Sequence, residues 1–406
     1  MSSVEEKFAK LGTEHAPGQE VRLGGELPDS ALRGGLLSGV AVDFSHGDVN
    51  DTAFPPAPGA LEAFVEGEGR GSEQAYSEYR GGAELRDVIA RKLAAFTGCP
   101  IAASDELIIT PGTQGALFLA LGATVTAGDR VAIVRPDYFA NRKLVDFLGG
   151  EVVPVRLDYL AESGRAGVDL QQLEDAFKSG ARVFLFSNPN NPIGVVYSPT
   201  EIACVAQMAN RYGVTVIVDQ LYSRLVYSGH SYTHLCASKI AADQVLTIMG
   251  PSKTESLSGY RIGAAFGASY LVDRAEMLQA IVSLRAPGYS QGVLRTWFDE
   301  PEGWLAERTM RHQAIRDDLI ALLRAVPGLT VCTPGAGSYL FPKLPALSIG
   351  LPDFVRALRI QANVVVTPGT EFSPDATDSI RLNFSQNHQA AVQAVVRIVQ
   401  LIERYR

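Results

Sequence analysis

The sequence predicts an α/β protein with three parts: a large domain with a mostly parallel sheet between helices, a smaller α+β C-terminal domain and an N-terminal arm. The length of 406 residues is too great for one ordinary domain and suits two unequal ones. Hydrophobic residues make up 46% of the chain and charged residues 20%, which is typical of a globular protein. Short apolar runs alternate with helix patterns along the middle of the chain, as in sheets covered by helices.

The elements follow from these patterns in chain order. Residues 1–42 are rich in glycine and charge and are predicted to form an irregular arm or lid. Residues 85–93 show an amphipathic helix pattern. Apolar runs of strand length then recur between helix patterns, which predicts a mostly parallel sheet buried on both faces. The expected strands are 107–109, 130–134, 151–155, 183–186, 214–218, 245–249 and 263–267.

The C-terminal part has its own order of elements. A helix is expected over 276–284, and a longer one over 308–323 leads into strand, helix, strand, strand and helix. The predicted division is an arm over 1–42, a large domain over 43–300 that includes an early substrate loop, and a small domain over 301–406.

Composition excludes several classes of function. The formal net charge is −8 and no basic block is present, so no nucleic-acid partner is expected. No apolar run approaches a membrane span, and the first residues lack the pattern of a signal peptide. The four cysteines are scattered without metal-ligand spacing, which favours reduced thiols in a cytoplasmic protein and no metal site.

Lys253 is the most informative residue. It follows the apolar run 245–249 and is preceded by Ser252, so its amine is expected to face a pocket at a strand end. Arg261 follows eight positions later. A lysine that holds an aldehyde as a Schiff base, with an arginine on a phosphate of the same ligand, is the arrangement that pyridoxal phosphate (PLP) requires.

Partners for the ring of that cofactor lie upstream. The apolar run 214–218 ends at Asp219, whose carboxylate is suited to keep the ring nitrogen protonated. Tyr222 and Asn191 are expected to hydrogen-bond the ring hydroxyl oxygen, Asn191 from a rigid Pro/Gly turn.

These residues resemble a known family, the class I and II aminotransferases of PLP fold type I, from about Asp43 onward. Each motif is weak alone, but together they occur in the family's order and spacing. They are Asn191-Pro192-Ile193-Gly194, Asp219 with Tyr222, Ser252-Lys253 with Arg261, and Arg381-Leu382-Asn383-Phe384.

The resemblance implies further contacts to the cofactor. Gly112, Thr113 and Gln114 resemble the phosphate cup, where a loop entering a helix presents its amides to an anion. Ser252 is implied as another phosphate contact. Tyr138 resembles the ring that stacks on the cofactor face.

The resemblance also implies contacts to the substrate and to a partner subunit. Arg381 resembles the clamp on the substrate α-carboxylate, where a guanidinium fork is suited to the work. Asn191 and Gly47 are implied as substrate contacts. Tyr76 resembles a tyrosine lent to the partner subunit's phosphate, which implies a homodimer.

Each assignment has a structural alternative. Lys253 and Arg381 are of types that are commonly solvent-exposed, Asp219 suits the N-cap of a helix, and Tyr138 suits core packing. Their shared order favours the functional interpretation.

Departures from the family pattern point to a branch. His46 stands before Gly47 where relatives have a small or apolar residue, and a histidine there can move protons near neutral pH. The alternative is a structural histidine hydrogen-bonded to the arm. Gly250 stands where a serine is common, which removes one phosphate contact, and Gln220 stands where many relatives have an acid.

The loop around His46 and the segment 284–291 look most like PLP-dependent L-arginine oxidases and hydroxylases of bacterial natural-product pathways, with capreomycidine synthases nearby. An arginine substrate needs acids for its guanidinium. The candidates are Glu14, Asp48, Asp51 and Glu371, each of which is otherwise a solvated surface acid.

The sequence therefore favours O2-dependent oxidation or hydroxylation of L-arginine, or of a close analogue, through a quinonoid, with Lys253, Asp219 and His46 as catalytic residues. An aminotransferase with a 2-oxo acid acceptor and a cyclase of hydroxy-arginine remain as alternatives. The oxidase consumes O2 without an acceptor, the aminotransferase needs a 2-oxo acid acceptor, and the cyclase needs neither.

Overall fold

The computed structural model describes residues 3–13, 16–19, 32–46, 52–160 and 166–406. Within them an eight-stranded sheet has the order β2-β9-β8-β7-β6-β3-β4-β5. The strands are β2 (Leu107–Thr110), β3 (Arg130–Arg135), β4 (Glu151–Asp158), β5 (Gly167–Val168), β6 (Val183–Ser187), β7 (Thr215–Asp219), β8 (Val245–Met249) and β9 (Gly263–Gly267). Five neighbours, β4, β3, β6, β7 and β8, run parallel, whereas β9 is antiparallel to both of its neighbours. The mostly parallel sheet predicted from the sequence is confirmed.

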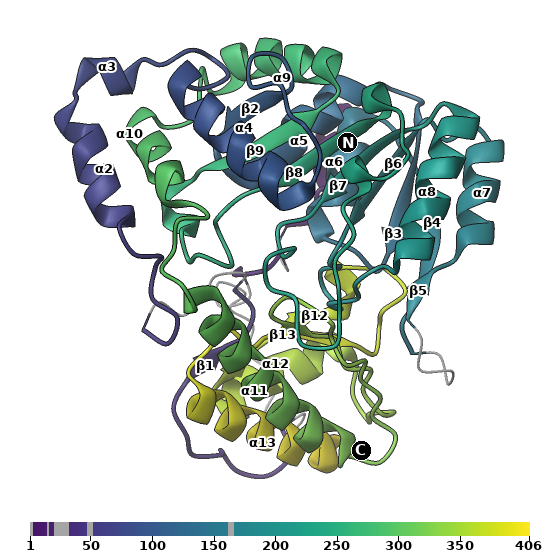
Figure 1. Cartoon of the computed structure of the whole chain (residues 1–406). Coiled ribbons are helices and arrows are strands. Elements are labelled where there is room, and N and C mark those ends of the chain that lie inside the picture. The colour runs from purple at the N-terminus through teal and green to yellow at the C-terminus, as the bar shows by residue number, and fades with distance from the viewer. Residues whose placement is uncertain (1–2, 14–15, 20–31, 47–51, 161–165) are drawn as a thin grey trace.

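Helices cover both faces of this sheet (Figure 1). One face packs against α7 (Leu170–Lys178) and α8 (Pro199–Tyr212), and the other against α5 (Gly112–Thr124), α6 (Phe139–Leu148) and α9 (Ser269–Val282). Helix α4 (Ala83–Thr97) packs at the end formed by β2 and β9. Burial on both faces explains why the strands read as continuous apolar runs in the sequence.

Short elements flank the sheet. The short helices α2 (Ala60–Gly69), α3 (Ser72–Ala75) and α10 (Gly288–Gln291) lie together at one side of it (Figure 1). The two-residue strand β5 was not predicted, because two residues are too few to give a pattern.

A second body lies below the sheet in Figure 1 and holds α11 (Trp304–Arg324), α12 (Leu351–Ala362) and α13 (His388–Tyr405). Its strands are β10 (Tyr339–Leu340), β13 (Ile380–Asn383) and β12 (Thr367–Pro368), together with β11 (Val364–Val365), which pairs with β1 (Val42–Asp43). The predicted order of elements is reproduced, with one additional short strand.

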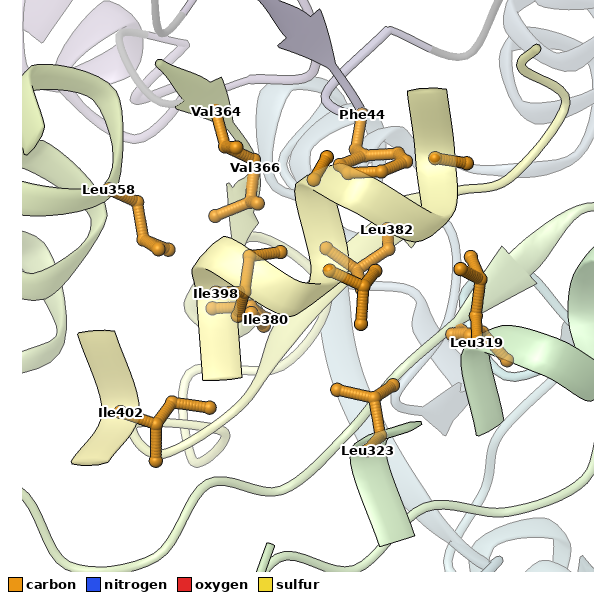
Figure 2. Packing of buried hydrophobic residues seen from close by; sticks show 14 of the residues in the cluster. Phe44, Leu319, Leu323, Leu358, Val364, Val366, Ile380, Leu382, Ile398 and Ile402 are labelled. Carbon is orange, nitrogen blue, oxygen red and sulfur yellow. The ribbon is translucent and has the colours of Figure 1, made fainter. Parts of the chain in front are cut away.

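Residues 42–44 pack with this second body. Figure 2 shows Phe44 among side chains of the small-domain cluster, including Leu382 and Val366. Phe44 is fully buried, and its carbonyl accepts a hydrogen bond from the backbone N–H of Asn383. The predicted boundary had assigned residue 42 to the arm and residues 43 and 44 to the large domain. We propose that residues 42–45 belong with the small domain and that the boundary near 300 stands.

The arm contains regular structure. Helix α1 (Ser3–Ala9) lies against α6, where the rings of Phe8 and Phe147 meet edge to face at 6.0 Å. The Lys143 ammonium on α6 donates to the carbonyl of Gly12. The arm was predicted to be irregular, and the helix is held by these contacts with α6 rather than by a strong pattern of its own.

No helix among the described residues is both long and apolar enough to cross a lipid bilayer.

The small-domain cluster gives a stability prediction. Ile398→Ala removes a fully buried side chain from α13 and should lower the free energy of unfolding by about 2–5 kcal/mol. Val396→Ala on the same helix is the matched control, because Val396 is exposed, and should change it by less than about 0.5 kcal/mol. Urea unfolding measures both, and equal losses would contradict the packing described.

Candidate active site

The carboxyl ends of the parallel strands enclose a cavity of about 220 Å³. Asp219 ends β7, Ser187 ends β6, and Lys253 lies in the turn after β8. The cavity is lined by most residues that the sequence predicted. They are Thr113, Gln114, Tyr138, Asn191, Asp219, Tyr222, Ser252, Lys253, Arg261 and Arg381.

One end of the cavity suits a phosphate. Helix α5 begins at Gly112 without a side-chain cap, so the amides of its first turn are available to an anion. Gly112 has φ +73°, and a Cβ there would lie 2.6 Å from Nη2 of Arg261. Glycine therefore lets the guanidinium approach the start of the helix, where Ser252 also lines the wall.

The structure explains why position 250 is glycine. A Cβ on Gly250 would lie 2.9 Å from Cγ2 of Thr113 and 3.2 Å from the backbone of Gly263. A serine at position 250 would require one of these neighbours to move. The phosphate end of the cavity therefore depends on Ser252, Arg261 and the start of α5.

Asp219 is placed to meet a cation in the cavity. Its Oδ1 accepts from the backbone N–H of Leu221 at 3.1 Å. The residues after it form a turn rather than a helix, so the N-cap alternative is wrong. Burial raises the pKa of the Asp219 carboxyl to about 6, and a protonated ring nitrogen beside it would favour the ionised form.

Arg381 reaches the cavity from β13 of the small domain. It is 1% exposed, which excludes the surface alternative. Its Nη1 donates to Oδ1 of Asn191 at 3.2 Å and its Nη2 to the carbonyl of Ser45 at 2.8 Å. Within the described residues its Nε has no hydrogen-bond partner. A buried guanidinium with an unused donor suits a carboxylate ligand.

Two tyrosines that the sequence assigned to the cofactor line the cavity. Tyr138 lines the cavity, and its hydroxyl donates to Oε1 of Gln114 at 2.9 Å. Tyr222 also lines it, and its hydroxyl is bonded to that of Tyr339 at 2.6 Å. Because Oδ1 of Asn191 faces Arg381, its Nδ2 is the group that can donate to a ligand.

Several predicted residues lie elsewhere. His46 is 53% exposed, is not part of the cavity wall, and has Nε2 3.3 Å from a carboxylate oxygen of Asp43. Tyr76 is 76% exposed on the surface, under the guanidinium of Arg285. The Glu371 carboxylate accepts from Lys143 at 2.7 Å, outside the wall. Glu14, Gly47, Asp48 and Asp51 lie outside the described residues.

Sequence reasoning missed residues that act across the chain. Tyr339 lines the cavity from β10, and its partner Tyr222 is 117 positions away. Asp137 lies beneath the wall and bonds to Ser187, 50 positions away. Asp137 could have been found from the sequence, because it directly precedes Tyr138. No spacing in the sequence links Tyr339 to the site. Pro17, Leu117 and Phe139 also line the cavity and were not predicted.

Comparisons with known proteins agree with this arrangement. The family model described as Aminotransferase class I and II matches residues 41–399. The crystal structure of an aspartate aminotransferase from Rhodobacter sphaeroides 2.4.1 is 60% identical, with all of both chains covered and a TM-score of 0.94.

Two more distant relatives also have names of amino-group-transferring enzymes. An aspartate aminotransferase of Musicola paradisiaca is 25% identical over 332 residues, 81% of this chain and 82% of the relative. Kynurenine–oxoglutarate transaminase 1 of Homo sapiens is 25% identical over 367 residues, 87% of this chain and 80% of the relative.

The pKa of Asp219 gives a prediction for the protein without ligand. Because the folded state holds this proton more tightly than the unfolded chain, the free energy of unfolding should fall as pH rises from about 4 to about 7, by about 1–3 kcal/mol from this group. Asp137, whose pKa is raised to about 7, adds a fall of the same sign. Measured by urea unfolding, the free energy of unfolding of Asp219→Asn should fall less between these pH values than that of the wild-type protein. Identical pH profiles for the two proteins would contradict the placement of Asp219.

Proposed function

Because this chain belongs to the class I and II aminotransferase family, we propose that it moves the amino group of an L-amino acid to a 2-oxo acid. The observation that carries the proposal is the meeting of Lys253, Asp219 and Arg381 in one cavity. These three supply an amine, an anion and a carboxylate clamp, which the first half of amino transfer requires.

PLP is the cofactor of this family, and the cavity fits it. The uncapped start of α5 with Arg261 and Ser252 suits the phosphate, and Tyr138 offers a ring for stacking. Bound PLP supplies an aldehyde that condenses with amines and a ring that accepts electrons from the adjacent carbon.

The chain's own groups then have distinct tasks. The Lys253 amine, at the cavity wall, is suited to take the proton from the substrate α-carbon and to return a proton in the second half. Asp219 keeps a negative charge at the ring nitrogen. Arg381 fixes the α-carboxylate, and so orients the α-carbon toward Lys253.

L-Aspartate is the donor that we propose to test first. The support is the 60% identical aspartate aminotransferase structure. Among the described residues of the wall the basic side chains are Lys253, Arg261 and Arg381, and each already has a task. A distal carboxylate therefore needs a basic group from elsewhere, such as a partner subunit.

Oxidation or hydroxylation of L-arginine is the second candidate. It depends on His46, whose loop continues into residues outside those described. The position of His46 beside Asp43 and outside the cavity wall favours the structural alternative for this residue. The relatives named above are aminotransferases, which supports amino transfer over the oxidase, and the cyclase has no separate support.

We also propose a homodimer in which Tyr76 reaches the partner's phosphate. Its support is an exposed group of apolar side chains on α2, α9 and nearby loops. They are Leu61, Val65, Tyr76, Tyr79, Met277, Ile281 and Leu284.

A donor and acceptor panel tests the proposed function. PLP-loaded protein with L-aspartate and 2-oxoglutarate should form glutamate, with no O2 uptake above background. O2 uptake with L-arginine and no 2-oxo acid would instead support the oxidase. Consumption of hydroxy-arginine without O2 or an acceptor would support the cyclase.

The clamp predicts a specific loss. Arg381→Lys keeps the charge but loses the planar fork, so kcat/KM should fall about 100-fold, mostly through a higher KM. The exposed Arg70→Lys is the matched control and should leave both constants unchanged. An unchanged KM in Arg381→Lys would remove Arg381 from the clamp.

A further inference from the structure

Asp137 is a buried carboxylate to which the assignments above give no task. It lies between β3 and α6 and is 2% exposed. Its Oδ1 accepts from the backbone N–H of Tyr138 at 2.6 Å and from the Ser187 hydroxyl, and its Oδ2 accepts from the Ser187 N–H at 2.9 Å. All three donors are neutral.

The contacts of Asp137 continue into the cavity wall. The Ser187 Oγ accepts from the backbone N–H of Asn191 at 3.0 Å. Asn191 in turn accepts from Arg381. Ser187 also pairs with Asp219 in the register of β6 and β7. Asp137 is therefore linked to Asn191, which contacts Arg381, through a single residue, Ser187. Asp219, the acid expected at the ring nitrogen, lies on the strand next to Ser187.

The hydrogen bonds of Asp137 do not explain why a charged side chain, whose burial opposes folding, stands at this position. A serine or asparagine can accept from neutral donors, whereas a buried carboxylate without a cationic partner opposes folding. A carboxylate in this place is favoured when a cation binds nearby, and the protonated ring nitrogen expected beside Asp219 is such a cation.

We propose that Asp137 is a positioning residue of the cofactor site. Its carboxylate holds Ser187, and through it Asn191, and it adds a second negative charge behind Asp219. The inference rests on PLP binding in this cavity but not on which amino acid or acceptor reacts.

The titratable groups around Asp137 are consistent with this role. Burial, with a smaller contribution from the charge of Asp219, raises the pKa of the Asp137 carboxyl to about 7. The buried Tyr197 hydroxyl also has its pKa raised, first by burial and then by the charge of Asp137. Two neighbouring carboxylates compete to ionise in an empty cavity, and a bound cation allows both to do so.

Asp137→Asn tests the charge while keeping the size. The readouts are the dissociation constant of PLP and the pH midpoint of the visible absorbance of the PLP-bound protein. The dissociation constant should rise about tenfold, and the midpoint should move to lower pH by about 0.5–1 unit, because a negative charge that favours the protonated cofactor is lost. Gln361→Ala removes a buried hydrogen-bonding side chain of the small domain, outside the cavity wall, and is the control for lost stability alone.

Ser187→Ala tests the link to Asn191 and keeps the carboxylate. It should raise KM for the amino donor several-fold with kcat nearly unchanged, and leave the absorbance midpoint in place. A wild-type midpoint and PLP affinity in Asp137→Asn would overturn the charge role. If Asp137→Asn does not fold, an unchanged KM in Ser187→Ala would overturn the proposal. The PLP dissociation constant and the absorbance midpoint do not require turnover, so these two readouts separate this inference from the choice of reaction.

Discussion

Charged side chains gathered around one cavity, of which Arg381 and Asp137 are buried, are the constraint on which the structure depends. Lys253, Arg261, Arg381 and Asp219 line this cavity, and Asp137 lies behind its wall, bonded to Ser187. Burying such groups is costly unless they are paired or a ligand completes them. A ligand with a phosphate, a protonated ring and a carboxylate-bearing partner matches this set of charges, which explains why a fold with an apolar core retains so many charges at one edge of its sheet.

The parallel sheet delivers these groups, but it does not complete the site. Strands β6, β7 and β8 end at the same edge, so the residues after them converge from distant parts of the sequence. The small domain adds Arg381 and Tyr339, which bond to Asn191 and Tyr222 of the large domain. The Lys143–Glu371 pair joins the domains beside the arm. Cofactor binding and clamping of the substrate carboxylate are therefore coupled to how the two domains meet.

The sequence predicts the part of this arrangement that is local. A lysine after a strand, an aspartate ending one and a glycine before a helix carry their signals within a few residues, and Lys253, Asp219 and Gly112 all lie where such patterns indicate. Contacts such as Tyr222 with Tyr339 depend on how the domains dock, and a single sequence holds no trace of that. His46 shows the opposite limit: its residue type suits proton transfer, yet its position beside Asp43 could be learned only from the fold.

A single-turnover experiment tests the central claim, that this cavity performs amino transfer, most directly. PLP-loaded protein is mixed with excess L-aspartate and no 2-oxo acid, and released 2-oxo acid and dissolved O2 are followed together. Amino transfer predicts one equivalent of 2-oxo acid per active site, then arrest, with no loss of O2. Continued product formation with matching O2 consumption would contradict the account.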